Sequence, residues 1–366
     1  MSVLHLLASG GTGGIESLVK DYGVYSQNDN YFLFLWNGGI TAEEMKAAGM
    51  QVLVLEASKK DLIGPWNRIC ALCKEHNIHT VVVHHASPVA HLYLLLLKKK
   101  FPGIQTVAYA HGCAEDMRGG AKKRGLKLRR FLIRQSLKKA DRVIAISHAV
   151  RKSLIRYYGI PEESIVVIYN GTDCQKIKAD FHPGHSPIQI VYVGRLIEQK
   201  GVQILLQALG QLADMSGWHL NIIGDGPYRG QLETLVRQMN LTDRVAFHGI
   251  CRDVPQRLAA ADLFVHSPIW EEGFGITIIE AMAAGLLCIC AQSGAIPEII
   301  DSGVDGYLVE KGNVQELADK LRFCIENYDT ENTVAMRQAA VKKARHFSIE
   351  MFVQQLDGVL KGNSED

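Results

Sequence analysis

Two pairs of charged residues in the second half of the sequence have the types and spacing that suit a phosphorylated ligand. Arg195 and Lys200 lie just past an apolar run, and fixed cations in such a place can bind a diphosphate. Glu272 and Glu280 stand eight positions apart, and a carboxylate can bind hydroxyl groups or stabilise positive charge. Each of these residues alone could be an ordinary solvated charge, so the prediction depends on their combination.

Glycine-rich turns accompany these charges. Gly273 and Gly275 would let the main chain approach a ligand closely, at the start of a helix expected near Ile276. Gly224 to Pro227 forms another tight turn. The segment from Ser9 to Glu16 is a candidate phosphate loop, although it fits neither G-x-G-x-x-G nor the Lys-Ser/Thr of a P-loop, and such turns also serve plain tight packing.

The hydrophobic pattern predicts the elements that would position these residues. Short runs of Val, Ile and Leu alternate with segments of helical period, which indicates an α/β fold with doubly wound parallel sheets. The predicted strands are 3–8, 31–36, 51–55, 80–84, 106–110, 142–146 and 164–169 in the first half, and 188–194, 219–223, 245–248, 263–266, 287–291 and 306–309 in the second.

The length of 366 residues suits two domains of about 150–200 residues each. Proline and glycine interrupt the pattern between Cys174 and Pro187, which places the expected boundary near residue 182. We therefore expect an N-terminal domain over 1–182, a C-terminal domain over 183–347, and an amphipathic helix within 348–366 that docks on a domain. Open α/β sheets bind ligands beyond the carboxyl ends of their strands, so two facing domains would define a cleft there.

Composition excludes several other classes of protein. With 47% hydrophobic and 21% charged residues the chain is neither disordered nor collagen-like, and its longest apolar runs fall short of the roughly 20 residues of a membrane span. The first residues show no pattern of a secretory signal, so a cytoplasmic location is expected. The eight cysteines are scattered, which predicts reduced thiols; Cys70 and Cys73 with His76 and His79 indicate a helix from Trp66 to Lys74 rather than a zinc site.

The order of these motifs resembles the family-4 glycosyltransferases, which are retaining enzymes with two facing Rossmann-like domains (the GT-B architecture) and nucleotide-diphosphate sugars as donors. The resemblance spans nearly the whole chain. It rests on Gly13-Gly14-Ile15-Glu16, His111, Ser147, Asn170-Gly171-Thr172-Asp173, Gly194-Arg195, Lys200-Gly201, Gly224-Asp225-Gly226-Pro227, Glu272-Gly273-Phe274-Gly275 and Glu280-Ala281-Met282.

The resemblance implies a role for each matched residue. Arg195 and Lys200 would bind the diphosphate, Glu280 the ribose hydroxyls, and Glu272 with the backbone of Gly273 to Ile276 the donor sugar. His111 matches the histidine beside the donor sugar in the family, although most of the 14 histidines of this chain should be ordinary core or loop residues. The implied donor site also includes Gly13, Gly14, Gly194, Gly224, Phe274, Gly275 and the base-binding segment from His248 to Arg252.

Three departures from the family pattern bear on which donor sugar is bound more than on whether the protein is active. Gly112 follows the histidine where many members have Asp, Leu287 replaces a frequent Pro, and Ala295 replaces the second Gly of a frequent pair. They leave the identity of the donor sugar open.

The expected reaction needs no metal or other cofactor. The departing diphosphate gains negative charge, which fixed cations and helix N-termini can stabilise, and the sequence contains no Asp-x-Asp pair of the kind that holds a metal in other transferases. Three rivals remain: a nucleotide-sugar epimerase on the same fold, a non-catalytic sugar-nucleotide-binding subunit, and a nicotinamide-dependent dehydrogenase, for which the glycine loop lacks the dinucleotide register.

Charge is distributed unevenly along the chain. Residues 1–180 contain 25 Lys and Arg against 15 Asp and Glu, whereas residues 181–366 contain 15 against 23. Ten cations and no acidic residue lie between Arg118 and Lys139, interleaved with apolar residues. This pattern favours a basic amphipathic helix that binds an anionic membrane surface over a helix that packs on its own domain with solvated cations. Nucleic acid is a weaker alternative, because no aromatic platform accompanies the charge. Docking on the membrane would bring the acceptor site of the first domain to the lipid. The expected patch comprises Lys122, Lys123, Arg124, Lys127, Arg129 and Arg130.

Overall fold

The computed structural model describes residues 1–11, 13–84, 87–114 and 123–362, and it describes only the backbone of residues 123–126. The chain divides into two compact units, and each is described by itself. Unit 1 comprises Met1–Gly171 together with Ile349–Asp366, and unit 2 comprises Thr172–Ser348.

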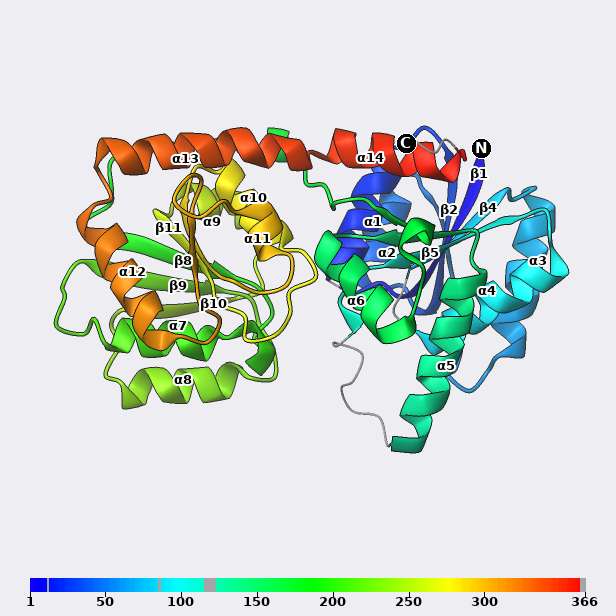
Figure 1. Cartoon of the computed structure of the whole chain (residues 1–366), viewed down its shortest axis with the longest axis horizontal. Helices are drawn as coiled ribbons and strands as arrows, with labels where there is room; N and C mark the ends of the chain where they lie inside the picture. Colours follow the sequence, from blue (N-terminus) through cyan, green and yellow to red (C-terminus); the bar gives the residue numbers. More distant parts are fainter. Residues whose placement is uncertain (12, 85–86, 115–122, 363–366) are drawn as a thin grey trace. The chain divides into compact units, whose positions relative to one another are not determined.

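Unit 1 is built around a seven-stranded parallel sheet in the order β3-β2-β1-β4-β5-β6-β7 (Figure 1). The order reverses next to β1, which is the arrangement of a Rossmann-like sheet with a topological switch point. The strands are β1 Ser2–Ser9, β2 Asp29–Asn37, β3 Gln51–Val54, β4 Thr80–His84, β5 Gln105–Ala110, β6 Arg142–Ala145 and β7 Ile165–Val167. The helices are α1 Gly14–Tyr25, α2 Gly39–Ala47, α3 Ile63–Glu75, α4 Pro88–Lys100, α5 Lys123–Lys139, α6 His148–Tyr158 and α14 Ile349–Leu360.

Unit 2 repeats this plan with a six-stranded parallel sheet in the order β10-β9-β8-β11-β12-β13. The strands are β8 Ile188–Val193, β9 Trp218–Ile223, β10 Val245–Gly249, β11 Leu263–His266, β12 Leu287–Ala291 and β13 Tyr307–Val309. The helices are α7 Val202–Gly210, α8 Arg229–Gln238, α9 Val254–Ala259, α10 Ile276–Ala283, α11 Ile296–Ile299, α12 Val314–Glu326 and α13 Glu331–Ala344. The predicted α/β fold class is confirmed, and each predicted strand is present within two residues of its expected ends.

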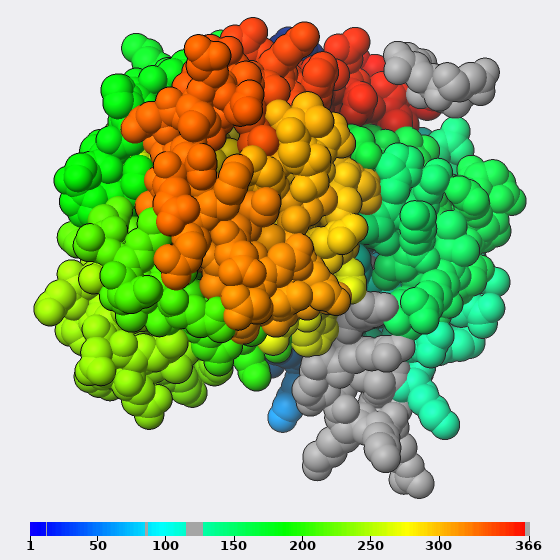
Figure 2. Space-filling view, turned by 60° about the vertical axis from the view of Figure 1, so that its left-hand side comes forward, coloured from blue at the N-terminus to red at the C-terminus, as the bar shows by residue number. Residues whose placement is uncertain are grey.

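Helices cover both faces of the unit 2 sheet. Helix α7 packs against α8 and α12 on one face, and α10 packs against α9 and α13 on the other. Figure 2 shows side chains of α12 and α13, in orange, on the surface of unit 2. Burial of near-continuous apolar strands such as Leu263–His266 between two helical layers explains why their sequences lack alternation.

The boundary between the units lies between Gly171 and Thr172, earlier than the expected position near residue 182. The backbone N–H of Thr172 donates to the carbonyl of Phe347 at 3.0 Å, which ties the start of the segment to unit 2. The expected domain ranges of 1–182 and 183–347 therefore shift to a boundary at Gly171. The segment between Thr172 and Pro187 lacks periodicity, as a linker does, but residues far away in the sequence hold it against unit 2.

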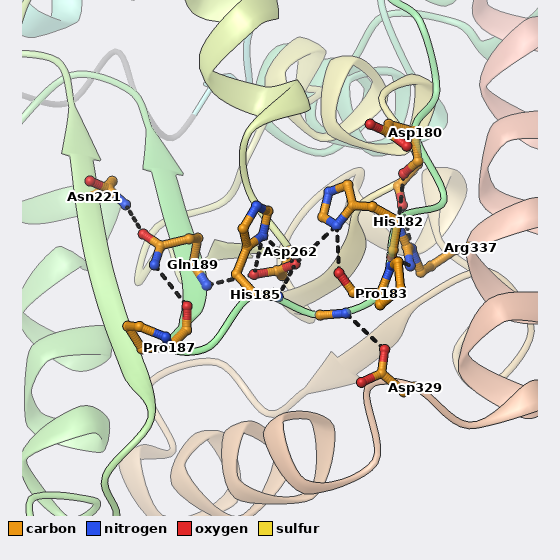
Figure 3. Close-up of polar contacts among 12 residues, drawn as sticks. Asp180, His182, Pro183, His185, Pro187, Gln189, Asn221, Asp262, Asp329 and Arg337 are labelled. Atoms are coloured by element: carbon orange, nitrogen blue, oxygen red, sulfur yellow. Dashed lines mark hydrogen bonds and ion pairs between the residues drawn. The ribbon is translucent and has the colours of Figure 1, made fainter.

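Two buried side chains, Arg337 and Asp262, anchor this segment (Figure 3). The guanidinium of Arg337, only 2% exposed, donates to the carbonyls of Gly285 at 2.6 Å and Asp180 at 2.8 Å. The carboxylate of Asp262 is fully buried and accepts from the backbone N–H of Gln189 at 2.6 Å and from Nδ1 of His185 at 2.9 Å. Buried polar groups must be paired in this way, so the segment belongs to unit 2.

Helix α14 follows α13 in the sequence but belongs to unit 1. Its Asp357 carboxylate accepts hydrogen bonds from the hydroxyl of Tyr22 at 2.6 Å, from Ser26 at 3.0 Å and from the amide of Asn28 at 2.9 Å. Phe352 packs edge-on to the ring of Tyr22. The expected C-terminal amphipathic helix is therefore present and packs on the first unit.

Two further expectations concern cysteine and membranes. Cys70 and Cys73 lie buried within α3, as the helical interpretation requires, and none of the eight cysteines, all of which the structure describes, forms a disulfide. Among the described helices, none has the length and hydropathy that crossing a bilayer demands.

Candidate active site

The candidate residues of unit 2 gather at one edge of its sheet. Because all neighbouring strands are parallel, the loops after β8, β9, β10 and β11 leave the sheet on the same side. The loops after β8, β9 and β11 carry Arg195, Gly224 and Glu272, and His248 is the penultimate residue of β10. The structure therefore brings the four predicted motifs to the carboxyl ends of adjacent strands, the place where open α/β sheets bind ligands.

Glu272 lies at the centre of a three-residue cluster. Its Oε2 accepts from Nζ of Lys200 at 2.6 Å and from Nε2 of His266 at 3.1 Å. Lys200 ends a 3₁₀ turn before α7, and His266 is the last residue of β11. The Glu272 side chain is 15% exposed, so the ion pair is largely shielded from water.

The environment of Glu272 keeps it ionised. Burial alone would raise the pKa of this carboxyl, but the positive charge of Lys200 and the hydrogen bond from His266 outweigh burial and hold it well below its ordinary range. Burial also lowers the pKa of His266, which favours a neutral imidazole that donates its Nε2 proton to Glu272. The cluster thus presents a fixed negative charge at neutral pH.

A second loop holds the Glu272 segment in place. The backbone N–H of Ala295 donates to the carbonyl of Glu272 at 2.9 Å, and the N–H of Gly294 donates to the carboxylate of Glu271 at 2.8 Å. Glu271 is also paired with Lys311. Gly294 adopts φ +54°, and a Cβ there would lie 2.0 Å from the carbonyl oxygen of Glu272. Only glycine fits this close crossing, so the position of Glu272 depends on it.

Lys200 is positioned by a similar close approach. Gly201 follows it with φ +67° as the N-cap of α7, and a Cβ at this position would lie 1.8 Å from the carbonyl oxygen of Ser267. The hydroxyl of Ser267 donates in turn to the carbonyl of Gly201 at 2.9 Å. The loops that carry the cation and the acid are therefore packed backbone to backbone, which fixes the separation of Lys200 and Glu272.

Arg195 and Glu280 differ in their surroundings. Arg195 is exposed, and its guanidinium forms no ion pair with any residue that the structure describes. Glu280 lies one turn into α10, whose N-cap is Gly275 and whose first residue is Ile276. Gly273 and Phe274 are buried just before that helix. A cation, a carboxylate and the N-terminus of a helix therefore lie at this edge of the sheet.

The segment expected to bind the base begins at an ordered histidine. Nε2 of His248 hydrogen-bonds to Oδ1 of Asn221 at 2.8 Å, and Nη1 of Arg257 donates to its Nδ1 at 3.2 Å. Burial and the charge of Arg257 lower the pKa of His248. Ile250 is 71% exposed, and Arg252 is exposed beside it. This loop offers an aliphatic surface and donors, which suits a flat heterocycle.

The first-unit candidates lie at the carboxyl edge of the other sheet. His111 follows β5, and its Nε2 is 2.9 Å from Nδ1 of His84. Gly13 is the N-cap of α1 and Gly14 its first residue, as the candidate loop predicted, while Thr12 lies outside the described residues. The carboxylate of Glu16 lies against Gly13. The phosphate-binding role of this loop stays a prediction.

The sequence reasoning gave no role to several residues that shape the site. His266 is the last residue of a predicted strand and stands six residues before Glu272, and this position is a signal of contact. Glu271 and Lys311 are too far apart in sequence for pattern reasoning. His84 and His5 interrupt apolar strands, and a polar residue in a fully buried strand is the available signal.

One group of described residues has the spacing of metal ligands. It comprises His182, His185 and Asp262. The Asp262 oxygens already accept from the N–H of Gln189 and from His185, and His182 is hydrogen-bonded to its neighbour's carbonyl (Figure 3). This arrangement accounts for the cluster as an anchor of the segment before β8.

Two family models match the chain. The model for glycosyl transferases group 1 matches residues 173–347, and that for glycosyltransferase family 4 matches residues 36–176. The chain is 26% identical over 306 residues to an N-acetyl-alpha-D-glucosaminyl L-malate synthase from Bacillus anthracis, covering 80% of this chain and 77% of that protein. It is 27% identical over 357 residues to a GDP-mannose-dependent alpha-(1-6)-phosphatidylinositol monomannoside mannosyltransferase from Mycobacterium tuberculosis, covering 89% of each.

The fold is also similar to solved structures. The Anabaena protein HepE, solved in complex with UDP, superposes with a TM-score of 0.85 at 24% identity and covers 99% of this chain and 100% of that one. With two Rossmann-like units and matching family models over both, the chain belongs to the family-4 glycosyltransferases of GT-B architecture. It is accordingly a glycosyltransferase, as the motif order predicted.

The Lys200–Glu272 pair gives a prediction for stability. Ionised Glu272 contributes stability above the ordinary pKa of about 4.5, and this contribution is lost as the pH falls through its lowered pKa. In Lys200→Met the carboxylate stays buried without its cation, so urea unfolding at pH 7 should show a loss on the order of 1–3 kcal/mol. The loss should shrink as the pH falls below 4.5, where Glu272 of the variant becomes protonated.

Lys342→Met is the matched control, because Lys342 is exposed and lies outside the cluster. It should change stability by less than about 0.5 kcal/mol at either pH. A Lys200→Met loss that is equal at pH 7 and pH 4 would show that the ion pair does not hold Glu272 ionised.

Proposed function

We propose that the protein is a retaining, metal-independent glycosyltransferase that moves a sugar from a UDP-sugar to a glycan or lipid-linked acceptor. The observation that carries this proposal is the cluster of Lys200, His266 and Glu272, with Arg195 exposed at the same edge of the sheet. The cluster is a fixed pair of opposite charges, and transfer from a diphosphate creates charges of both signs.

The positive groups suit the leaving group. Cleavage of the bond between sugar and diphosphate leaves negative charge on the phosphate oxygens, and preorganised cations stabilise that charge best where they need not move. Lys200 is fixed by its bond to Glu272, whereas Arg195 is exposed and available. The N-terminus of α10 adds the positive end of a helix dipole. These groups can act without a metal ion.

The negative group suits the other half of the transition state. The sugar acquires oxocarbenium character, which a nearby carboxylate stabilises if that carboxylate stays ionised. The lowered pKa of Glu272 meets this requirement. Glu272 then acts by its charge, and Glu280 is the residue proposed to bind the ribose hydroxyls. A nucleotide-sugar epimerase on the same fold would use the same donor groups, and a non-catalytic subunit would bind the donor without turnover.

The relatives support a nucleotide-sugar donor but differ in base and acceptor. The Anabaena structure contains UDP, whereas the printed name of the mycobacterial relative specifies GDP-mannose and a phosphatidylinositol monomannoside. The B. anthracis relative is named for transfer to L-malate. Uracil is the smaller of the two bases, and the exposed Ile250 offers a single aliphatic surface for it. We therefore favour UDP.

Two measurements test the proposal. Free UDP should raise the melting temperature more than GDP or ADP, because a ligand at 100 times its dissociation constant stabilises by about 2.7 kcal/mol. With UDP-sugars and candidate acceptors, NMR of the product should show the donor's anomeric configuration, and a chelator should leave the rate unchanged. An inverted product contradicts the retaining assignment, and an isomerised sugar nucleotide without an acceptor product indicates the epimerase.

Arg195 should be required for turnover and hardly for stability. Arg195→Ala removes an exposed cation and should lower kcat on the order of 100-fold, while Arg195→Lys should recover part of the rate because it keeps the charge. Arg237→Ala, an exposed arginine on α8, is the control and should keep the wild-type rate. Wild-type turnover in Arg195→Ala would remove this residue from the mechanism.

We further propose that α5 docks unit 1 on an anionic membrane surface at the cytoplasmic face. Leu128 and Phe131 are 63% and 56% exposed and lie one turn apart, next to exposed Lys127 and Arg130. Figure 1 shows the N-terminal end of α5 extending beyond the neighbouring helices of its unit. This pairing of exposed apolar and basic side chains is what an interfacial helix requires.

The structure changes the expected composition of this patch. Two of the apolar residues of α5, Ile133 and Leu137, are buried in unit 1, and Arg129 is half-buried. Lys122 lies outside the described residues, and the side chains of Lys123 and Arg124 are not described. The docking surface proposed for the described residues is therefore Lys127, Leu128, Arg130 and Phe131.

Liposome co-sedimentation tests the docking surface. Each cation near an anionic surface contributes about 1 kcal/mol, so Lys127→Gln with Arg130→Gln should weaken binding roughly 10-fold or more, and Leu128→Ser with Phe131→Ser should weaken it as well. Lys152→Gln with Arg156→Gln removes the same charge from exposed positions of α6 and serves as the control. Binding should fall with salt. Equal binding to neutral vesicles contradicts the proposal.

A further inference from the structure

Four polar side chains form a row across four neighbouring strands of unit 1. Asn30 is on β2, His5 on β1, His84 on β4, and His111 just past β5. The strand register explains the row: Val3 is opposite Asn30, Val82 is opposite His5, and Tyr109 is opposite His84. Each member of the row therefore lies two residues beyond the partner of the previous one. Side chains two apart share a face of the sheet, so the row runs diagonally toward its carboxyl edge.

The row is a continuous chain of hydrogen bonds. Oδ1 of Asn30 is 3.1 Å from Nε2 of His5, Nδ1 of His5 is 3.0 Å from Nε2 of His84, and Nδ1 of His84 is 2.9 Å from Nε2 of His111. His5 is fully buried and His84 is 3% exposed. The space beside His84 is lined by apolar and aromatic side chains and has no room for a water molecule.

The direction of these hydrogen bonds follows from one end. The amide nitrogen of Asn30 donates to the carbonyl of Asn28 at 3.2 Å, which leaves Oδ1 of Asn30 as the atom facing His5. An amide oxygen can only accept, so His5 must carry its proton on Nε2. A neutral imidazole has one proton, so Nδ1 of His5 accepts from Nε2 of His84. The same step then requires Nδ1 of His84 to accept from Nε2 of His111.

Burial keeps the two inner imidazoles neutral. It lowers the pKa of His5 to about 4 and holds the pKa of His84 well below the ordinary value, to which the neighbouring His111 and His5 also contribute. The rings of His5 and His84 are stacked, and Phe32 stacks on the other side of His5. Reversal of the hydrogen-bond donors along the row would therefore require all three rings to change tautomer together, or one imidazole to become protonated in an interior without water.

We propose that Asn30, His5 and His84 are positioning residues that fix the tautomer of His111, so that neutral His111 carries its proton on Nε2 and presents Nδ1 as a hydrogen-bond acceptor. Any group that binds this nitrogen must then be a hydrogen-bond donor, such as a hydroxyl of a sugar. The tautomer itself is independent of the activity. Its use in catalysis rests on the proposed transferase function, in which His111 is expected beside the donor sugar.

The histidine tautomer can be measured in the full chain. Two-bond ¹H–¹⁵N correlation spectra of ¹⁵N-histidine-labelled protein distinguish the two neutral tautomers, and the His111→Gln variant assigns the His111 signals. Wild type should show His111 protonated on Nε2 only. In His84→Phe, which keeps a ring but removes both nitrogens, His111 should show a mixture of the two tautomers.

Variants at the far end of the row keep the test informative if His84→Phe fails to fold. Asn30→Leu removes the terminal acceptor and should also yield mixed tautomers, whereas Asn30→Asp keeps an acceptor and should preserve the wild-type spectrum. Tyr109→Phe is the matched control, since Tyr109 contacts both His84 and His111 and its hydroxyl has no hydrogen-bond partner in the described part of the chain. Protonation of His111 on Nδ1 in wild type, or an unchanged single tautomer in both disrupting variants, would overturn the proposal.

Activity and nucleotide binding separate this proposal from the proposed function. His84→Phe should lower kcat by about 10-fold, while the thermal shift caused by free UDP should stay at the wild-type value, because His84 is not among the residues expected to bind UDP. Absence of transfer in wild type would contradict the transferase function and leave the tautomer result standing. A normal kcat in a variant with mixed tautomers would overturn the role of the row in catalysis.

Discussion

The attraction between Lys200 and Glu272 is the interaction on which the candidate site depends. A carboxylate in a largely shielded position is stable only when its charge is compensated, and here one oxygen accepts from both Lys200 and His266. The surrounding backbone is arranged to preserve this contact. Gly201 and Gly294 permit two close crossings, and a side chain at either position would separate the loops. The charge pair explains why two glycines far from each other in sequence serve the same site.

Both units hold polar side chains in a shielded position, but they stabilise them by different interactions. In unit 2 a buried acid is neutralised by a cation, whereas in unit 1 buried imidazoles are neutral and joined only by hydrogen bonds. The first arrangement supplies a permanent negative charge, and the second fixes which nitrogen of each imidazole donates its hydrogen bond. Both end at the carboxyl edge of a parallel sheet, where the backbone of the strands no longer occupies the space. The fold provides the edge, and the side chains decide what chemistry it performs.

The sequence predicted the strands well because buried parallel strands are continuous apolar runs, as in β4 and β11. It also predicted which loops carry Arg195, Lys200 and Glu272. It misplaced the unit boundary because Arg337 and Asp262 hold the segment after Gly171 from positions far along the chain. It gave no role to His5 or His84, since their function depends on strand register. A local sequence pattern shows periodicity and composition, but it does not show which side chains far apart in the sequence form hydrogen bonds with one another.

The return of α14 to unit 1 has a consequence for biosynthesis. Unit 2 is one uninterrupted stretch that is complete once Ser348 has been made, whereas unit 1 lacks helix α14 until Leu360 has been made. Until then Tyr22, Ser26 and Asn28 have no Asp357 to bind, and the apolar face that Phe352 covers is open. The segment translated first is therefore the last to be finished. During synthesis on the ribosome, an incomplete unit 1 therefore exposes apolar surface of the kind that makes folding intermediates prone to aggregation.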